Sequence, residues 1–327
     1  MQKVTLGIDI SKDKLDVALW QEGRYQQATF SNEKEGYRRL AKWLKKRNAK
    51  GAHVCIEATG RYGEAVSLYL HERDYPVSVV NPARVKAYAD SQLQRNKTDR
   101  QDAKVIAHFC ATQQPDLWSP PPPEVQERQA LVRRLENLQA DRVRELNRQQ
   151  SGLRSETVLQ AIAAHIAFLD DQIATIQAQI KDHIDNHPHL RQQRDLLTSI
   201  PGIGDQTAAH FLAEVIDVHR FQSAQQLAAY AGLTPRNHHS GSSVHKPGRL
   251  VKTGNSYLRK ALYMPALTAM RWNPIIRALV ERLDARGKKR MTIVGAVMRK
   301  LVHLAFGVLK HQQPFDPNYL DNVQVTA

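Results

Sequence analysis

The 327-residue chain has a formal net charge of +15 and a pI of about 9.9, which favours a polyanionic partner such as nucleic acid. Its two cysteines, Cys55 and Cys110, exclude a disulfide framework and a cysteine-based zinc site, and they fit a reducing cytoplasm. The sequence opens without a signal-peptide pattern and has no apolar run long enough to span a membrane. We therefore expect a soluble cytoplasmic protein of two or three domains.

The first predicted domain, residues 1–112, alternates strand-like and helix-like segments. Helical stretches lie near Tyr37–Arg47 and Glu64–Glu72, between runs with the apolar alternation of strands. These runs are Val4–Asp9, Leu15–Trp20, His53–Glu57 and Val77–Val80. The alternation predicts an α/β sheet.

Four carboxylates in this domain lie at the ends of predicted elements. Asp9 and Glu57 each close a strand, and strand ends of open α/β sheets gather ligands. Asp99 and Asp102 follow Thr98, a favourable N-cap, and their spacing places both on one face of a first helical turn. Their oxygens suit Mg²⁺ or Mn²⁺, so the pattern predicts a divalent-metal site that cuts nucleic acid. The alternative is that these acids only cap helices and complement their dipoles.

A proline-rich stretch, Pro115 to Pro123, predicts a stiff linker over residues 113–125. A helical region, residues 126–188, follows and ends at Asn186-His187-Pro188. It carries an apolar seam with coiled-coil spacing, formed by Ile162, Ile166, Leu169, Ile173, Ile176, Ile180 and Ile184. The seam predicts either a helical hairpin that packs on itself or a coiled coil between subunits.

The last predicted domain, residues 189–327, opens with a helix-hairpin-helix pattern around Ile200-Pro201-Gly202-Ile203-Gly204. Gly202 and Gly204 permit a tight turn, and the backbone N–H groups that follow can hold a phosphate without reading a base. The alternative is a plain packing unit.

Further on lies a small, polar and basic loop that contains Ser240, Ser242 and Ser243. No aspartate or glutamate occurs between Asp217 and Glu281, so this part of the chain attracts phosphate. We expect nucleic-acid contacts from Arg236, Lys246, Arg249 and Lys252. A serine hydroxyl beside such cations can attack a phosphodiester, although serine-rich loops also serve as flexible connectors. The residues alone leave open which of the three serines reacts.

Several of these motifs together resemble the DEDD transposases of insertion-sequence family one-ten, also called bridge recombinases. The resemblance runs nearly end to end, and its motifs appear in the family's order. They are Gly7-Ile8-Asp9, Ile56-Glu57-Ala58-Thr59-Gly60, Asn96-Lys97-Thr98-Asp99-Arg100-Gln101-Asp102-Ala103, Ile200-Pro201-Gly202-Ile203-Gly204, and Ala231-Gly232-Leu233-Thr234-Pro235 followed by Ser240-Gly241-Ser242-Ser243.

The resemblance implies an RNase H-like, Holliday-resolvase-like N-terminal domain, a helical coiled-coil middle and a mainly helical C-terminal transposase domain. It implies that Asp9, Glu57, Asp99 and Asp102 bind Mg²⁺ and that Ser240 is the nucleophile of a covalent phosphoserine intermediate. It also implies a noncoding bridge RNA that pairs with target and donor DNA. The implied assembly is a dimer, or a tetramer of two dimers, that completes each site across subunits and joins the bacterial nucleoid when active.

Two other functions stay open at this stage. One is a magnesium-dependent, Holliday-junction-type nuclease that hydrolyses DNA with water, in which Ser240 only contacts phosphate. The other is a non-catalytic nucleic-acid binder whose carboxylates serve as helix caps.

Overall fold

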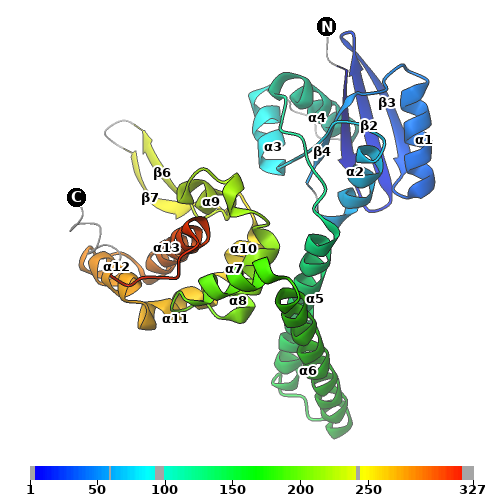
Figure 1. Ribbon diagram of the computed structural model, residues 1–327. Coiled ribbons are helices and arrows are strands. Elements are labelled where there is room, and N and C mark those ends of the chain that lie inside the picture. The colour runs from blue at the N-terminus through cyan, green and yellow to red at the C-terminus, as the bar shows by residue number, and fades with distance from the viewer. Residues whose placement is uncertain (1–3, 59, 93–98, 241–243, 319–327) are drawn as a thin grey trace. The chain divides into compact units, whose positions relative to one another are not determined.

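The computed structural model describes residues 4–58, 60–92, 99–240 and 244–318; the side chains of Arg61, Asp99, Arg100 and residues 236–249 are outside this description. The chain divides into two compact units, Met1–Pro121 and Pro122–Ala327. Figure 1 shows a sheet with helices in the first unit and a helical second unit with one β-hairpin.

The first unit contains one five-stranded mixed sheet of strand order β3-β2-β1-β4-β5. Its strands are β1 (Thr5–Ile10), β2 (Lys14–Gln21), β3 (Arg24–Ser31), β4 (His53–Glu57) and β5 (Val77–Val80). The first three strands form an antiparallel meander, whereas β4 and β5 run parallel to β1. The predicted α/β sheet is confirmed. The prediction omitted β3, because this edge strand exposes its first four residues and lacks apolar alternation.

Helices cover both faces of this sheet (Figure 1). On one face, α1 (Lys34–Lys45) and α2 (Glu64–His71) pack on the buried side chains of Leu6, Ile8 and Ile56. A short 3-10 turn, η1 (Arg61–Gly63), precedes α2. On the opposite face lie α3 (Pro82–Ser91) and α4 (Asp99–Gln113).

The second unit begins with a helical hairpin of α5 (Pro123–Gln149) and α6 (Glu156–Asp185). Ile180 and Ile184, from the predicted seam of α6, are buried against Val132 and Leu135 of α5. The C-terminal end of the seam therefore packs inside the chain, as the hairpin alternative predicts. Four seam residues remain only partly buried: Ile162, Ile166, Ile173 and Ile176.

The rest of the second unit is a helical core. It comprises α7 (Pro188–Thr198), α8 (Asp205–Glu214), η2 (Val218–Arg220), α9 (Ala224–Tyr230), α10 (Ser256–Ala261), α11 (Tyr263–Trp272), α12 (Pro274–Ala285) and α13 (Arg290–His311). By length and composition, α13 is apolar enough to cross a membrane. However, Val297, Leu301 and Ala305 of this helix are fully buried in the core, so packing accounts for its apolar character.

A two-stranded hairpin of β6 (Pro235–Ser240) and β7 (Val244–Leu250) lies between α9 and α10 in the sequence. The prediction of a loop over this segment was wrong for the residues on either side of the turn. Asn, His and Ser have weak strand preferences, so the composition indicated a loop. The hairpin is defined by backbone pairing, and polar composition carries little information about that pairing.

Candidate active site

Asp9 and Glu57 lie at the carboxyl ends of neighbouring parallel strands. Ile8 of β1 is paired with Ile56 of β4, and Asp9 and Glu57 are the next residues of the two strands. Because side chains alternate along a strand, both acids belong to the face that also carries Gly7. This is the face on which α4 packs.

The direction of α4 places its first turn at the same end of the sheet. Thr5 Oγ1 donates a hydrogen bond to the carbonyl oxygen of Ala107 (2.9 Å), near the middle of the helix. A Cβ atom on Gly7 would lie 2.2 Å from the carbonyl oxygen of Ala103, one turn earlier. Helix α4 therefore runs antiparallel to β1. Its first turn, which contains Asp102, lies at the end of β1 that carries Asp9.

Gly7 is the residue that allows this close approach of helix and strand. A Cβ atom at this position would also lie 2.3 Å from the backbone nitrogen of Ala107, well inside contact distance. Only glycine fits without displacement of α4. The strand-end sequence Gly7-Ile8-Asp9 thus combines a packing residue with a carboxylate two positions later.

The structure brings Asp9, Glu57 and Asp102 to one end of one face of the sheet. Asp99 is described only as the first residue of α4, and its side chain is outside the described part. Within the residues that the structure describes, no three His, Cys, Asp or Glu side chains are close enough together to be recognised as a metal-ion site. The roles of the four acids as metal ligands stay predictions.

Sequence reasoning missed a further carboxylate at this place, Asp16. It is paired with Asp9 across the antiparallel β1–β2 ladder, so both belong to the same face. Asp16 is only 5% exposed. Its carboxylate accepts a hydrogen bond from Thr29 Oγ1 (2.6 Å) and forms an ion pair with Lys14 Nζ (2.9 Å). The sequence did contain a signal for Asp16, because it lies between the apolar residues Leu15 and Val17 of a predicted strand. An acid in such a place is seldom buried unless another group pairs with it.

The predicted helix-hairpin-helix corresponds to α7, α8 and the turn between them. Gly202 has φ +107°, and a Cβ atom there would lie 2.7 Å from the Ala269 Cβ of α11. This glycine therefore has a packing function in the structure, whereas Gly204 is exposed with open space around it. Asp205, the first residue of α8, is also exposed, and its carboxylate lies 3.9 Å from the Arg194 guanidinium. Phosphate binding at this turn stays a prediction.

Ser240 is the last residue of β6, and its Cα is paired with that of Val244. Ser242 and Ser243 lie outside the described residues. Arg236 and Arg249 are paired across the same hairpin. Lys246 pairs with His238, whereas the exposed Lys252 follows β7 with φ +56°. The predicted nucleophile and four predicted cationic contacts thus belong to one hairpin and its exit, although the side chains within the hairpin are outside the description.

Two protein-family models match the chain. A model described as a DEDD transposase of the IS110 type matches residues 6–157. A model of the "Transposase IS116/IS110/IS902 family" matches residues 194–281. The first covers the four predicted site carboxylates, and the second covers the end of α7, the turn to α8, α8 itself and the β6–β7 hairpin.

Known proteins resemble the chain over most of its length. A "Pilin gene-inverting protein" of Moraxella bovis is 36% identical over 97% of this chain and 98% of its own length. The "Transposase for insertion sequence element IS1111A" of Coxiella burnetii is 26% identical over 73% of each chain. A solved structure, "T. thermophilus RuvC in complex with Holliday junction substrate", matches 34% of this chain and 96% of its own at 16% identity. Its TM-score of 0.27 is too low to establish a common fold.

Proposed function

Because the chain belongs to the IS116/IS110/IS902 family of DNA transposases and site-specific recombinases, we propose that it cuts and exchanges DNA strands through a covalent phosphoserine intermediate. The proposal assigns the nucleophile to Ser240. It assigns a divalent cation, Mg²⁺ by preference, to Asp9, Glu57, Asp99 and Asp102. The first unit would then be the RNase H-like nuclease domain of the enzyme.

The convergence of Asp9, Glu57 and the start of α4 on one end of one sheet face carries this proposal. Helix capping explains acids at the start of α4, but it does not explain why two strand-end acids lie at the same end of the same sheet face. Carboxylate oxygens are the donors that Mg²⁺ prefers. Such a cation, when bound, polarises a phosphate and stabilises the charge that develops on it.

The proposed covalent step balances without an external energy source. The Ser240 oxygen forms a bond to phosphorus as the phosphorus bond to one deoxyribose oxygen breaks. The serine proton leaves, and the displaced deoxyribose oxygen takes up a proton. Attack by a deoxyribose hydroxyl of another strand reverses the step and releases the serine, so a new phosphodiester forms without ATP.

Guidance by a noncoding bridge RNA is part of the proposal. The net charge of +15 supports binding of more than one nucleic acid, and the long interval without acids, from Asp217 to Glu281, supports contacts with their backbones. In that arrangement base pairing with the RNA selects target and donor DNA, while the protein contacts shape and backbone.

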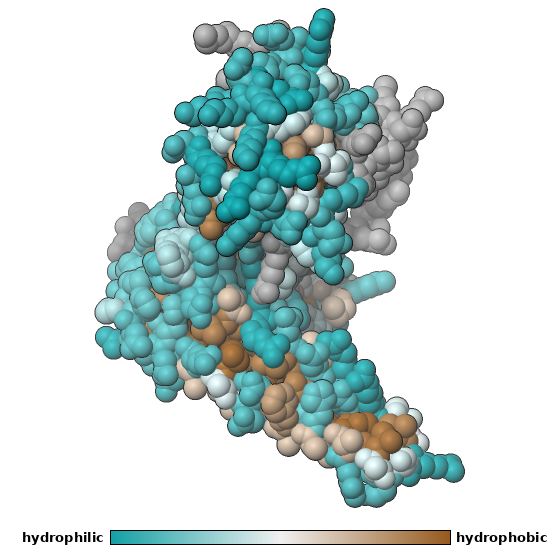
Figure 2. All heavy atoms as spheres, turned by 90° about the vertical axis from the view of Figure 1, so that its right-hand side faces the viewer, coloured by the Kyte–Doolittle hydropathy of each residue, from teal (hydrophilic) through white to brown (hydrophobic). Residues whose placement is uncertain are grey.

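A homodimer, or a pair of dimers, completes the proposal. The α5–α6 hairpin supports it, because Val143, Val158 and Phe168 are 53%, 44% and 57% exposed there. Figure 2 shows apolar side chains at the far end of this hairpin. A contiguous exposed apolar patch is typical of surfaces for protein association.

The test incubates the full-length protein with Mg²⁺, RNA from the region flanking its gene and labelled matching DNA, followed by denaturing electrophoresis. We expect a protein–DNA adduct that requires the RNA and disappears in Ser240→Ala. Ser243→Ala is the matched control and should retain the adduct. Asp102→Asn should abolish cleavage and retain DNA binding.

Each alternative function predicts a different result. Free cleaved DNA without an adduct in the wild type would indicate a hydrolytic nuclease. An Asp102→Asn variant with unchanged activity would indicate that the carboxylates serve only as caps. An adduct that forms equally well without RNA would reject the part of the proposal in which an RNA guides the enzyme.

A further inference from the structure

The two ends of the segment that carries β6 and β7 are fixed to each other. The backbone N–H of Asn255 donates to the carbonyl oxygen of Tyr230 (2.7 Å). One layer further into the hairpin, the N–H of Val251 donates to the carbonyl oxygen of Thr234 (3.0 Å). The hairpin therefore leaves the helical core from a closed base, formed by the end of α9 and the start of α10.

Two glycines show how tightly this base is packed. Gly254 has φ +150°, and a Cβ atom there would lie 2.4 Å from the Tyr230 carbonyl oxygen. Gly232 has φ +68°, and a Cβ atom there would lie 2.4 Å from the Arg259 guanidinium. At Gly254 the obstacle is backbone, so a side chain there would require displacement. At Gly232 the obstacle is the end of a flexible side chain, and the positive φ is what disfavours any other residue. At Gly254 the backbone of the base therefore approaches closely, with no room for a side chain between the two segments of chain.

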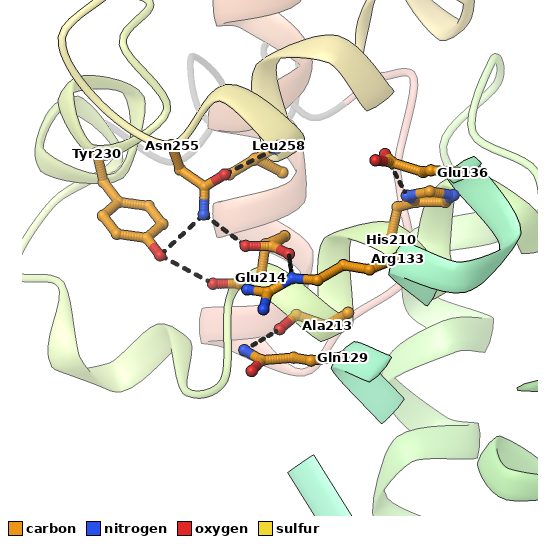
Figure 3. Close-up of polar contacts among 9 residues, drawn as sticks. All are labelled: Gln129, Arg133, Glu136, His210, Ala213, Glu214, Tyr230, Asn255 and Leu258. Carbon is orange, nitrogen blue, oxygen red and sulfur yellow. Dashed lines mark hydrogen bonds and ion pairs between the residues drawn. The ribbon is translucent and has the colours of Figure 1, made fainter. Parts of the chain in front are cut away.

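A buried carboxylate, Glu214 at the end of α8, holds this base from below (Figure 3). Its Oε2 accepts a hydrogen bond from Asn255 Nδ2 (2.6 Å), and its carbonyl oxygen accepts one from the Tyr230 hydroxyl (3.1 Å). Asn255 Nδ2 also contacts the Tyr230 hydroxyl (3.1 Å). Burial raises the pKa of Tyr230, so the phenol keeps the proton that it donates.

Helix α5 reaches the same carboxylate from the other side. Arg133 Nε lies 3.8 Å from Glu214 Oε1, and its guanidinium lies over the Tyr257 ring at 5.2 Å. Gln129 Nε2 donates to the carbonyl oxygen of Ala213 (2.8 Å), next to Glu214. Figure 3 shows Gln129 and Arg133 on one side of Glu214, with Asn255 and Tyr230 on the other.

Stability alone is a poor explanation for this arrangement. Glu214 is 6% exposed, and a buried ion pair commonly contributes no more stability than apolar side chains of the same volume. Directional hydrogen bonds between Glu214, Asn255 and Tyr230 do, however, fix the orientation of the elements that they join. Catalysis depends on such orientation, because a displacement of about 1 Å can lower a rate about 100-fold.

We propose that Glu214, Asn255 and Tyr230 are positioning residues that hold the base of the β6–β7 hairpin in a fixed orientation to α8 and α5, and thereby set where Ser240 is presented to the DNA. This inference rests on the proposed serine chemistry. In this proposal the three residues act through the hairpin and not through contacts of their own with DNA or the reacting atoms.

Two variants separate orientation from folding. Asn255 also caps α10, because its Oδ1 accepts from the N–H of Leu258 (2.9 Å). Asn255→Ser preserves a favourable cap and removes only the Nδ2 donor. Glu214→Leu removes the acceptor with a side chain of similar size. It also leaves Arg133 without its anionic partner, so a lower Tm is expected, and comparison with the Asn273→Ser control separates this loss of stability from a loss of orientation. Glu214→Gln retains an oxygen acceptor for Asn255 and is the conservative rescue.

The main readout is the single-turnover rate of adduct formation at saturating DNA. The DNA dissociation constant and Tm of each variant are measured alongside it. Asn255→Ser and Glu214→Leu should slow adduct formation at least 10-fold, with the dissociation constant unchanged within twofold. Glu214→Gln should stay within threefold of the wild type. Asn273→Ser is the matched control, since Asn273 also caps a helix and donates Nδ2 to a distant carbonyl, that of Pro201. It should reduce Tm and leave the rate unchanged.

Amide hydrogen exchange over residues 231–235 and 250–255 gives a second readout that needs no chemistry. Exchange there should accelerate in Asn255→Ser and Glu214→Leu but not in Asn273→Ser. Wild-type rates and unchanged exchange in both variants would overturn the inference, as would a rate loss that follows Tm across all four variants. Absence of an adduct in the wild type would overturn the serine chemistry; unchanged exchange would then also reject the fixed base, whereas accelerated exchange would retain it.

Discussion

Asp16 of β2 lies directly opposite Asp9 of β1, and its carboxylate is held by Lys14 and Thr29. Asp16→Ala would leave the Thr29 hydroxyl without its acceptor in a partly buried place. We expect a loss of roughly 1–3 kcal/mol in the free energy of unfolding, measured by urea denaturation. Asp16→Asn should lose less, because the amide oxygen still accepts from Thr29. Exposed Asp13→Ala is the control and should change stability by at most about 0.5 kcal/mol.

Gly7→Ala tests the contact between β1 and α4. The added methyl group would overlap the backbone at Ala103 and Ala107, so α4 must move away from the sheet. We expect a destabilisation of at least about 1–3 kcal/mol and loss of metal-dependent cleavage, since the start of α4 would shift from Asp9. Gly307→Ala, inside α13 with open space around it, should be neutral or stabilising by about 0.5–1 kcal/mol. Similar Tm values for the two variants would contradict the proposed contact.

Gly202→Ala distinguishes the two interpretations of the helix-hairpin-helix turn. The positive φ and the contact with Ala269 predict a lower Tm for this variant, because alanine is strained there and would push against α11. Gly204→Ala has space and should preserve Tm. If Gly204→Ala also weakens DNA binding and reduces its salt dependence, the turn binds phosphate. Unchanged DNA binding would indicate that the turn serves only in packing.

Cys55 and Cys110 are both buried, one on β4 and one on α4. A hydrogen bond with Cys55, together with burial, raises the pKa of the Cys110 thiol, and this suppresses the reactive thiolate. We expect no reaction of native protein with a thiol reagent at pH 8 and reaction of both cysteines in denaturant. Rapid modification of the native protein would show that the α4–β4 contact opens readily.

The lowered pKa of His303 in α13 makes the stability of the folded protein depend on pH. Burial, followed by the neighbouring charges of Arg299 and Lys300, lowers its pKa below the ordinary value of about 6.5. The unfolded chain therefore binds the proton more readily, so this contribution is complete above about pH 6.5 and is lost as the pH falls below it. The decrease in Tm from pH 7.5 to pH 5.5 should be smaller in His303→Gln than in the wild type. Equal decreases would contradict the assignment.

The α/β sheet, the two strand-end acids, the long helical region and the family could all be predicted from the sequence. These features are local in the chain: alternation predicts strands, spacing predicts helices, and motifs in order identify relatives. Asp9 and Glu57 could be singled out because each closes a strand.

Which positions lie next to one another was not predictable from the sequence and became visible in the folded chain. The structure places Asp16 opposite Asp9, packs Gly202 against Ala269 and buries the C-terminal end of the α6 seam against α5. It also revealed the cluster around Glu214, whose members come from separate helices. Register, helix direction and packing between distant segments fix such relationships, and no single stretch of sequence contains them because their energies arise only when the segments are brought together.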